Sequence, residues 1–244
     1  MNRREAAALL GTLVLAGCGG GSSGGGGGGT GAAAAVGGGV AETPDASALR
    51  TPPTPHLALW GDSMVPPLAR ALALLLPDRE VHDGGVIGDT SMQVLERLQA
   101  ASPALRDRIT VFWFGHNNIR LSGSDAAAQV KADLAQAIAS LAPGNDDYIV
   151  LALVNNATTA PAGTPEYDTV LRLNQDLAAA YPLHFFDIRR FMVEQADPAT
   201  PQGAIDREHD VPASTLRADD IHLSGFGADV LAKRLQLLLQ AFGW

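Results

Sequence analysis

The sequence has one cysteine among 244 residues, Cys18, so an intramolecular disulfide is excluded. It also lacks an excess of positive charge, since 17 lysine and arginine residues stand against 26 aspartate and glutamate residues and the net charge is −9. This balance argues against a nucleic-acid partner, because nucleic acid selects basic surfaces. It argues equally against attraction to anionic lipid headgroups. We see no internal repeat.

The first residues carry Arg3 and Arg4, followed by an apolar run over residues 6–16. This is the order of a secretory signal peptide, and the run is too short for a permanent membrane-spanning helix. It ends in Leu15-Ala16-Gly17-Cys18, which resembles a bacterial lipobox, where cleavage precedes a cysteine that is then acylated. We therefore expect residues 1–17 to be a lipoprotein signal peptide and Cys18 to be lipidated. An ordinary signal peptide is the alternative.

A lipidated Cys18 implies attachment to a membrane through the lipid anchor and a place in the bacterial cell envelope. Several acyl chains hold a protein stably at a membrane, whereas one chain holds it only marginally. Gly19 follows the cysteine, and a residue other than aspartate there would permit transfer to the outer membrane in a Gram-negative host.

Residues 18–54 consist mainly of Gly, Ala, Ser, Thr and Pro. Such a composition buries too little apolar area to offset chain entropy, so we predict a disordered tether. Its glycine run at 24–29 is no phosphate-binding loop, because no strand precedes it and no lysine follows it. Residues 55–244 have the length and composition of one folded domain.

Apolar runs of strand length alternate with stretches of helical period along this domain. The predicted strands span residues 56–60, 79–82, 109–114, 148–154 and 184–187. The predicted helices span residues 65–76, 91–101, 125–141, 169–180 and about 227–242. The runs at 109–114 and 148–154 are apolar throughout, which parallel strands covered on both faces require. We therefore predict an α/β fold with a doubly wound, five-stranded parallel sheet in a three-layer α/β/α sandwich.

Ligands bind open parallel sheets at the carboxyl ends of the strands. Small polar segments follow four of the predicted strands, namely Gly61-Asp62-Ser63, residues 83–91, Gly115-His116-Asn117-Asn118 and Asn155-Asn156. These segments predict a pocket at one edge of the sheet.

Ser63 follows the first predicted strand and precedes a helix with Pro66 and Pro67 in its first turn, where a missing N–H is tolerated. Its oxygen is expected near the positive end of that helix, which favours the charge developed during nucleophilic attack. The alternative is that Ser63 only caps the helix.

His222 lies three residues after Asp219, a spacing that puts both side chains on one face of a tight turn. A carboxylate that accepts a hydrogen bond from the imidazole Nδ1–H would hold His222 as a general base for Ser63. Asp220 is an alternative orienting acid. His116 has no acid at a suitable local spacing, so we expect it in the pocket wall.

The tripeptide Glu208-His209-Asp210 could suggest metal ligands. It lies within residues 194–217, which are rich in Pro, Ala and Asp, and we predict a solvated loop there instead. No metal and no cofactor are expected.

The ordered set Gly61-Asp62-Ser63, Gly88, Gly115-His116-Asn117 and Asp219-x-x-His222 resembles the four sequence blocks of the SGNH/GDSL hydrolases. These are esterases, lipases and carbohydrate-ester deacetylases with a flavodoxin-like three-layer fold. The resemblance implies that Ser63 is the nucleophile, His222 the general base and Asp219 its orienting acid. It also implies an oxyanion hole formed by the backbone N–H groups of Ser63 and Gly88 and the side-chain amide of Asn117.

Two positions depart from the family pattern. Met64 replaces the usual leucine after the serine, a change that conserves volume. Asn118 stands where the family commonly has aspartate, so a charge is lost while hydrogen bonding is kept.

The leading hypothesis is a lipid-anchored serine ester hydrolase of the cell envelope that acts on a small-molecule or glycan ester. The second is an O-acyltransferase acting on envelope glycans, since a sugar hydroxyl can capture the same acyl-enzyme in place of water. The third is a catalytically silent module that binds glycan or lipid. Pocket depth, and with it the acyl length of the substrate, depends on the loops at 155–167 and 194–217. The sequence makes no prediction of oligomeric state.

Overall fold

The computed structural model describes residues 56–244. The predicted signal peptide, Cys18 and the predicted tether lie outside the described residues.

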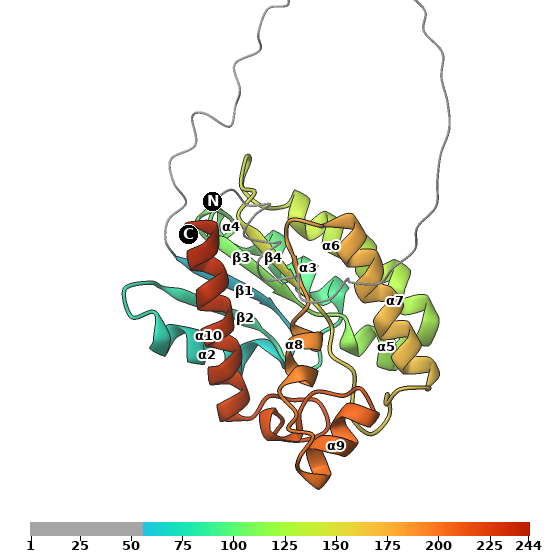
Figure 1. The fold of residues 1–244 in the computed structure, drawn as a ribbon. Coiled ribbons are helices and arrows are strands. Elements are labelled where there is room, and N and C mark those ends of the chain that lie inside the picture. Colours follow the sequence, from blue (N-terminus) through green and yellow to red (C-terminus); the bar gives the residue numbers. More distant parts are fainter. Residues whose placement is uncertain (1–55) are drawn as a thin grey trace, which may run out of the picture.

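Five strands form one parallel sheet with the order β2-β1-β3-β4-β5 (Figure 1). They are β1 (Leu57–Gly61), β2 (Val81–Gly85), β3 (Ile109–Trp113), β4 (Tyr148–Leu151) and β5 (Phe185–Phe186). The strand order reverses between β1 and β3, as it does in flavodoxin-like sheets. The predicted fold class is therefore confirmed.

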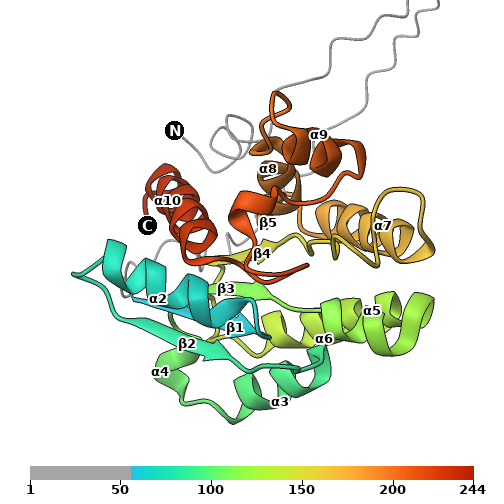
Figure 2. The same cartoon turned by 90° about the horizontal axis from the view of Figure 1, so that it is seen from below.

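Helices cover both faces of the sheet (Figure 2). One face carries α2 (Val65–Leu75), α8 (Ile188–Glu194) and α10 (Gly225–Phe242). The other face carries α3 (Ser91–Ala100), α6 (Ala126–Ala139) and α7 (Pro165–Ala180). Because strand side chains point alternately to the two faces, Leu57 and Leu59 pack in the first core and Ala58 and Trp60 in the second.

Shorter elements connect this frame. They are α4 (Pro103–Arg106), α5 (His116–Ser122), η2 (Gly123–Asp125), α9 (Pro201–Glu208) and η3 (Ser214–Leu216). The predicted strands and helices are all present with shifted ends, but residues 115–118 do not form the expected loop, because α5 begins at His116. Residues 194–217 are likewise wrongly predicted as a loop, since α9 lies there. Thr200 caps this helix by accepting from the Gly203 N–H, and Pro201 occupies its first turn.

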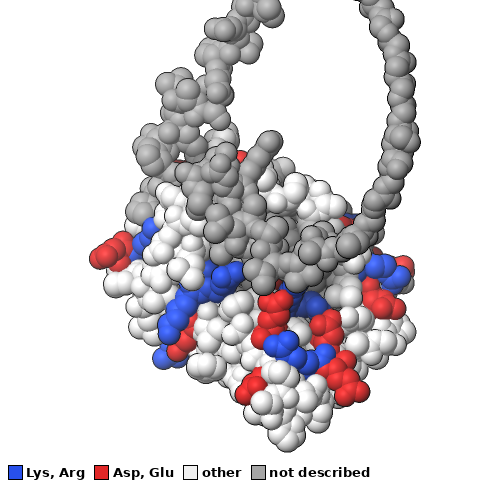
Figure 3. All heavy atoms as spheres, viewed as in Figure 1, with Lys and Arg blue, Asp and Glu red and all other residues white. Residues whose placement is uncertain are grey.

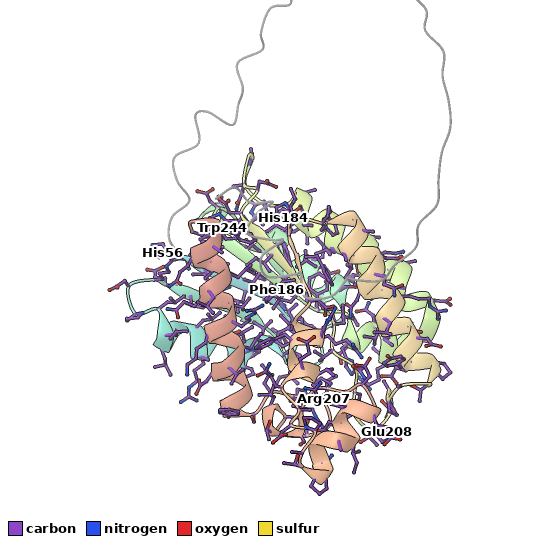
Figure 4. All side chains as sticks on the ribbon, in the orientation of Figure 1. His56, His184, Phe186, Arg207, Glu208 and Trp244 are labelled. Carbon is purple, nitrogen blue, oxygen red and sulfur yellow. The ribbon has the colours of Figure 1, made fainter. Side chains whose placement is uncertain are left out.

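The ends of the sheet can be followed in Figure 4. His56 and His184 directly precede β1 and β5 and lie toward the upper end of the view, whereas Arg207 and Glu208 on α9 lie at the other end. The strands therefore finish toward α9. Figure 3 shows charged side chains of both signs close together on the lower part of the molecule in this view. On α8, the exposed side chains of Arg190 and Glu194 form an ion pair (2.8 Å).

Candidate active site

Ser63 is half-buried in the turn that joins β1 to α2. Asp62 shapes this turn, because its backbone carbonyl accepts from the Val65 N–H (3.2 Å) and its carboxylate accepts from the Met64 N–H (3.0 Å). The N-cap position of α2 is Met64 and has no side-chain cap. The alternative that Ser63 only caps this helix is therefore wrong.

Glycine is required where β1 ends. A Cβ at Gly61 would lie 1.9 Å from the carbonyl oxygen of Trp113, so only glycine lets the two strands finish so close together. Gly115 turns the chain from β3 into α5 with a φ of 122°, a conformation that residues with a Cβ rarely adopt. These two positions bring the Ser63 turn and the start of α5 to the same edge.

Ser63, His222 and Asp219 form a continuous line of contacts. The Ser63 Oγ lies 2.9 Å from His222 Nε2, and His222 Nδ1 lies 2.8 Å from Asp219 Oδ2. An ionised carboxylate only accepts, so Nδ1 carries the proton and donates it to Asp219. The Nε2 atom is then free to accept from the Ser63 hydroxyl. This is the arrangement that activates a serine for nucleophilic attack.

Asp219, and not Asp220, holds the imidazole. The second carboxylate oxygen of Asp219 accepts from the backbone N–H groups of Ile221 (2.9 Å) and His222 (2.8 Å), which fixes the tight turn predicted from the spacing. The Asp220 side chain makes no hydrogen bond or ion pair with any residue in the described range. Its backbone carbonyl accepts from the Ala157 N–H (2.8 Å) and so joins the turn to the segment after β4.

The two carboxyl groups of the site lie in opposite environments. The N–H groups of Ile221 and His222 and the imidazole of His222 lower the pKa of Asp219 to about 2. Burial raises the pKa of Asp62 to about 6, although the Met64 N–H and the charge of His222 partly oppose the shift. At neutral pH both groups are ionised, but only Asp219 is stabilised in that form by its surroundings.

Three groups that could donate to an oxyanion lie in the segments that follow β1, β2 and β3. The backbone N–H groups of Ser63 and Gly88 make no hydrogen bond within residues 56–244, and Gly88 has a φ of 85°. The Asn117 side chain is buried, and its Nδ2 donates to the carbonyl of Asp89 (3.0 Å), which holds the amide against the residue after Gly88. The other hydrogen of that amide has no partner among the described residues.

Arg97, which the sequence analysis missed, ties these loops together from α3. Its guanidinium donates to the Asp89 carboxylate (2.8 Å) and to the carbonyls of Gly84 (2.7 Å) and Gly61 (3.1 Å). The Gly61 carbonyl also accepts from the Val86 N–H (3.1 Å). One side chain therefore connects the ends of β1 and β2 to the residue that orients Asn117.

Asn118 belongs to a buried polar network. Its side-chain oxygen accepts from the Ser91 N–H (2.9 Å), and its amide donates to the Ser91 hydroxyl (2.8 Å). That hydroxyl donates to the carboxylate of Asp133 (2.6 Å) on α6. Asp133 thus supplies a carboxyl group to the neighbourhood in which Asn118 departs from the family pattern. It is a second residue that the sequence analysis missed.

His116 is the first residue of α5 and is only partly exposed. Burial, followed by the charges of Arg120 and His222, lowers the pKa of His116 to about 4, so its imidazole is neutral at pH 7. Its Nδ1 is buried and makes no hydrogen bond in the described structure. His116 therefore does not pair with a carboxylate as His222 does.

The segment after β4 is fastened by a second polar network. Asn155 is fully buried and accepts from Arg189 Nε (2.9 Å), and the same guanidinium pairs with the Asp210 carboxylate (2.5 Å). The Tyr167 hydroxyl donates to that carboxylate (2.5 Å). Glu208 ends α9, and the Asp210 carboxylate belongs to this network, so the prediction of a solvated loop is wrong for both, while His209 between them is exposed.

Over residues 56–244, no three His, Cys, Asp or Glu side chains are grouped so that they could hold a metal ion. In the same range, no helix has both the length and the apolar character needed to cross a membrane.

The family model of the GDSL-like lipases and acylhydrolases matches residues 46–230. The chain belongs to this family. No curated protein sequence shows significant similarity to it.

Solved structures of other proteins share the fold of this chain. A lipase/acylhydrolase from Enterococcus faecalis is 20% identical, with a TM-score of 0.58 over 78% of this chain and 96% of that one. The acetyl xylan esterase AlAXEase is 14% identical, with a TM-score of 0.57 over 74% of this chain and 98% of that one. TesA is 20% identical, with a TM-score of 0.54 over 77% of this chain and 99% of that one.

Proposed function

We propose that this chain is a serine ester hydrolase that cleaves carboxylic esters through an acyl-serine intermediate. The observation that carries the proposal is the line of contacts from Ser63 through His222 to Asp219, at 2.9 and 2.8 Å. Membership of the GDSL-like lipase/acylhydrolase family supports the same reaction class.

In the acylation step, Ser63 Oγ attacks the ester carbonyl while its proton moves to His222 Nε2. Asp219 stabilises the imidazolium that forms and keeps Nδ1 protonated. The carbonyl oxygen becomes an oxyanion, and the N–H groups of Ser63 and Gly88 and the amide of Asn117 are the donors for it. Collapse of the tetrahedral intermediate releases the alcohol, which takes the proton from His222, and leaves Ser63 acylated.

In the deacylation step, His222 Nε2 removes a proton from water, and the resulting hydroxide attacks the acyl-serine carbonyl. The same donors stabilise the second oxyanion. The proton returns from His222 to Ser63 Oγ as the carboxylic acid leaves, which regenerates the free enzyme.

The test compares the purified protein with its Ser63→Ala variant on p-nitrophenyl esters from acetate to palmitate, on acetylated xylan and on acetylated peptidoglycan fragments. We expect turnover that depends on Ser63 and labelling of the wild type by a serine-reactive fluorophosphonate. The lipase and acetyl xylan esterase names of the structural neighbours justify including both ester classes. A folded wild type that neither turns over an ester nor reacts with the probe would instead indicate a silent binding module.

Transfer to a sugar hydroxyl is the alternative fate of the acyl group. Product analysis with an acetyl donor and an oligosaccharide distinguishes the two fates, because hydrolysis yields free acetate and transfer yields acetylated sugar. We expect acetate as the main product.

We also propose that the enzyme acts in the cell envelope, held by a lipid on Cys18. The lipobox-like sequence Leu15-Ala16-Gly17-Cys18 supports this proposal. Replacement of Cys18 by Ser should release the protein from membranes into the soluble fraction. Continued tight association of that variant with membranes would contradict the lipid anchor.

A further inference from the structure

The turn that carries Asp219 and His222 is held by a side chain that does not belong to the line of catalytic contacts. Arg217 Nη1 donates to the backbone carbonyl of Asp219 (3.2 Å), and Arg217 Nε donates to the carbonyl of Pro212 (2.8 Å). Its Nη2 pairs with the carboxylate of Asp206 on α9 (3.2 Å). One guanidinium therefore links the acid–base turn to two parts of the preceding segment.

Backbone hydrogen bonds close the base of this turn, and most of the residues at its tip, 218–222, are exposed or partly exposed. Arg217 and Leu223 form an isolated antiparallel bridge, and the Ala218 N–H donates to the His222 carbonyl (2.8 Å). The residues between them are exposed or partly exposed apart from Ile221. Backbone bonds thus close the base of the turn, while the position of its tip depends on contacts with neighbouring segments.

Asp206 provides a fixed anchor for Arg217. Asp206 is 1% exposed, and its carboxylate accepts from the Ser214 N–H (2.6 Å) and from Gln202 Nε2 (3.0 Å). Burial alone would raise the pKa of Asp206, but these donors and Arg217 together lower it. A buried carboxylate with three partners has little freedom to move, so Arg217 is held at one end by a rigid group.

We infer that Arg217 is a positioning residue that, anchored by buried Asp206, fixes the carbonyl of Asp219 and thereby the hydrogen bond between Asp219 and His222. The inference rests on the proposed function of His222 as general base. It assigns the segment 194–217, through α9, a role in supporting the acid–base turn.

The variant Arg217→Met removes all three donors while keeping an unbranched side chain. Because a displacement of about 1 Å at a catalytic group can reduce the rate about 100-fold, we expect kcat to fall about 10- to 100-fold with KM changed less than about threefold. The assay temperature must lie well below the thermal midpoint, so that nearly all of the variant is folded. A lower stability of the fold alone would then leave kcat unchanged.

The matched control is Arg207→Met. Arg207 also fastens α9 by donating to two backbone carbonyls, those of Ala196 (2.8 Å) and Glu194 (2.9 Å), but it makes no hydrogen bond or ion pair with residues 217–222. We expect this variant to keep wild-type kcat. An equal loss of kcat in both variants would overturn the inference, because it would show that any loosening of α9 has the same effect.

A second readout does not require turnover. Long-range ¹H–¹⁵N NMR of the imidazole distinguishes the Nδ1–H tautomer, which Asp219 favours, from the Nε2–H tautomer. We expect the Nδ1–H form for His222 in the wild type and in Arg207→Met, and a shift toward the Nε2–H form in Arg217→Met. A fall in kcat without any change of tautomer would overturn the inference.

Arg217→Met leaves Asp206 buried without its cation, so the double variant Asp206→Asn/Arg217→Met is measured beside it. In the double variant, the side-chain amide oxygen at position 206 can still accept from the Ser214 N–H, and no buried charge is left without a partner. Wild-type kcat and an unchanged tautomer in the double variant would refute the positioning role. If Ser63→Ala hydrolyses esters like the wild type, the proposed function fails instead, and the tautomer measurement still decides the role of Arg217.

Discussion

The site has two halves that are built in different ways. The half that contains Ser63, Gly88 and Asn117 grows directly from the ends of β1, β2 and β3, and Asp62 beneath it is buried. The half that contains Asp219 and His222 is a turn before α10, where the two side chains are 56% and 42% exposed. The ends of the strands place the first half, with Arg97 as an added tie, whereas a short turn held by its own hydrogen bonds and by Arg217 carries the second. The acid–base half should therefore tolerate substitutions without loss of fold while losing activity.

The largest effect that separates the halves is expected for Asp219→Asn. An amide at this position cannot favour the Nδ1–H tautomer as a carboxylate does, and such a change lowers kcat about 10⁴-fold in a serine–histidine–aspartate triad. The thermal midpoint should change little, because the side chain is more than half exposed. Steady-state kinetics and thermal melts measure the two quantities.

Asp220→Asn is the control for that prediction. It removes the same charge one residue away, where the side chain makes no hydrogen bond or ion pair with the described residues. We expect an unchanged kcat. A similar loss in both variants would mean that local charge, and not the contact with His222 Nδ1, accounts for the effect.

A smaller effect is expected for Asn117→Ala in the strand-end half. Loss of one oxyanion donor typically reduces the rate 10²- to 10³-fold, or about 2.7–4 kcal/mol. The loss should fall on kcat more than on KM, because the donor acts mainly in the transition state. An Asn117→Ala variant with wild-type kcat/KM would contradict the proposed role of Asn117 as an oxyanion donor.

Arg97→Met tests whether the first half also depends on a side-chain tie. Without the Arg97 guanidinium, Asp89 and Gly61 lose a hydrogen-bond donor, and the Asp89 carbonyl that accepts from Asn117 should become more mobile. We therefore expect kcat to fall about tenfold. Because hydrogen bonds to a charged, half-buried group contribute about 1.5–3 kcal/mol, the melting temperature should fall by roughly 5 °C. Arg190→Met breaks the exposed pair with Glu194 and should change stability by less than about 1 kcal/mol. If Arg97→Met is as mild, the strand ends alone place this half.

The contrast also explains which parts were predictable from the sequence. Local patterns predict the fold, because apolar runs in the sequence became β3 and β4. Local patterns also predict the candidate residues, because Ser63 and His222 lie in short, ordered sequence blocks. Arg97 contacts Gly61, which lies 36 positions away, and Ser91 bonds Asp133 across 42 positions. Such contacts exist only after the chain has folded, and no local pattern encodes them. The helix α9 was missed for another reason: among its eight residues only Ala204 and Ile205 are apolar, too few to reveal a helical period despite the Thr200-Pro201 start.

The last expected effect concerns the dependence of stability on pH, and it gives the two halves opposite signs. The pKa of Asp62 is raised from 3.8 to about 6, so between these values the folded state binds more protons than the unfolded state and stability falls as pH rises. A shift of this size corresponds to about 2–3 kcal/mol at neutral pH. Asp62→Asn keeps an oxygen to accept from the Met64 N–H, and its melting temperature should exceed that of the wild type by more at pH 8 than at pH 4. The lowered pKa of Asp219 acts in reverse, because its contribution is present above pH 4 and lost as pH falls through 2. An equal difference between Asp62→Asn and wild type at pH 4 and pH 8 would show that the buried carboxyl does not titrate in this range.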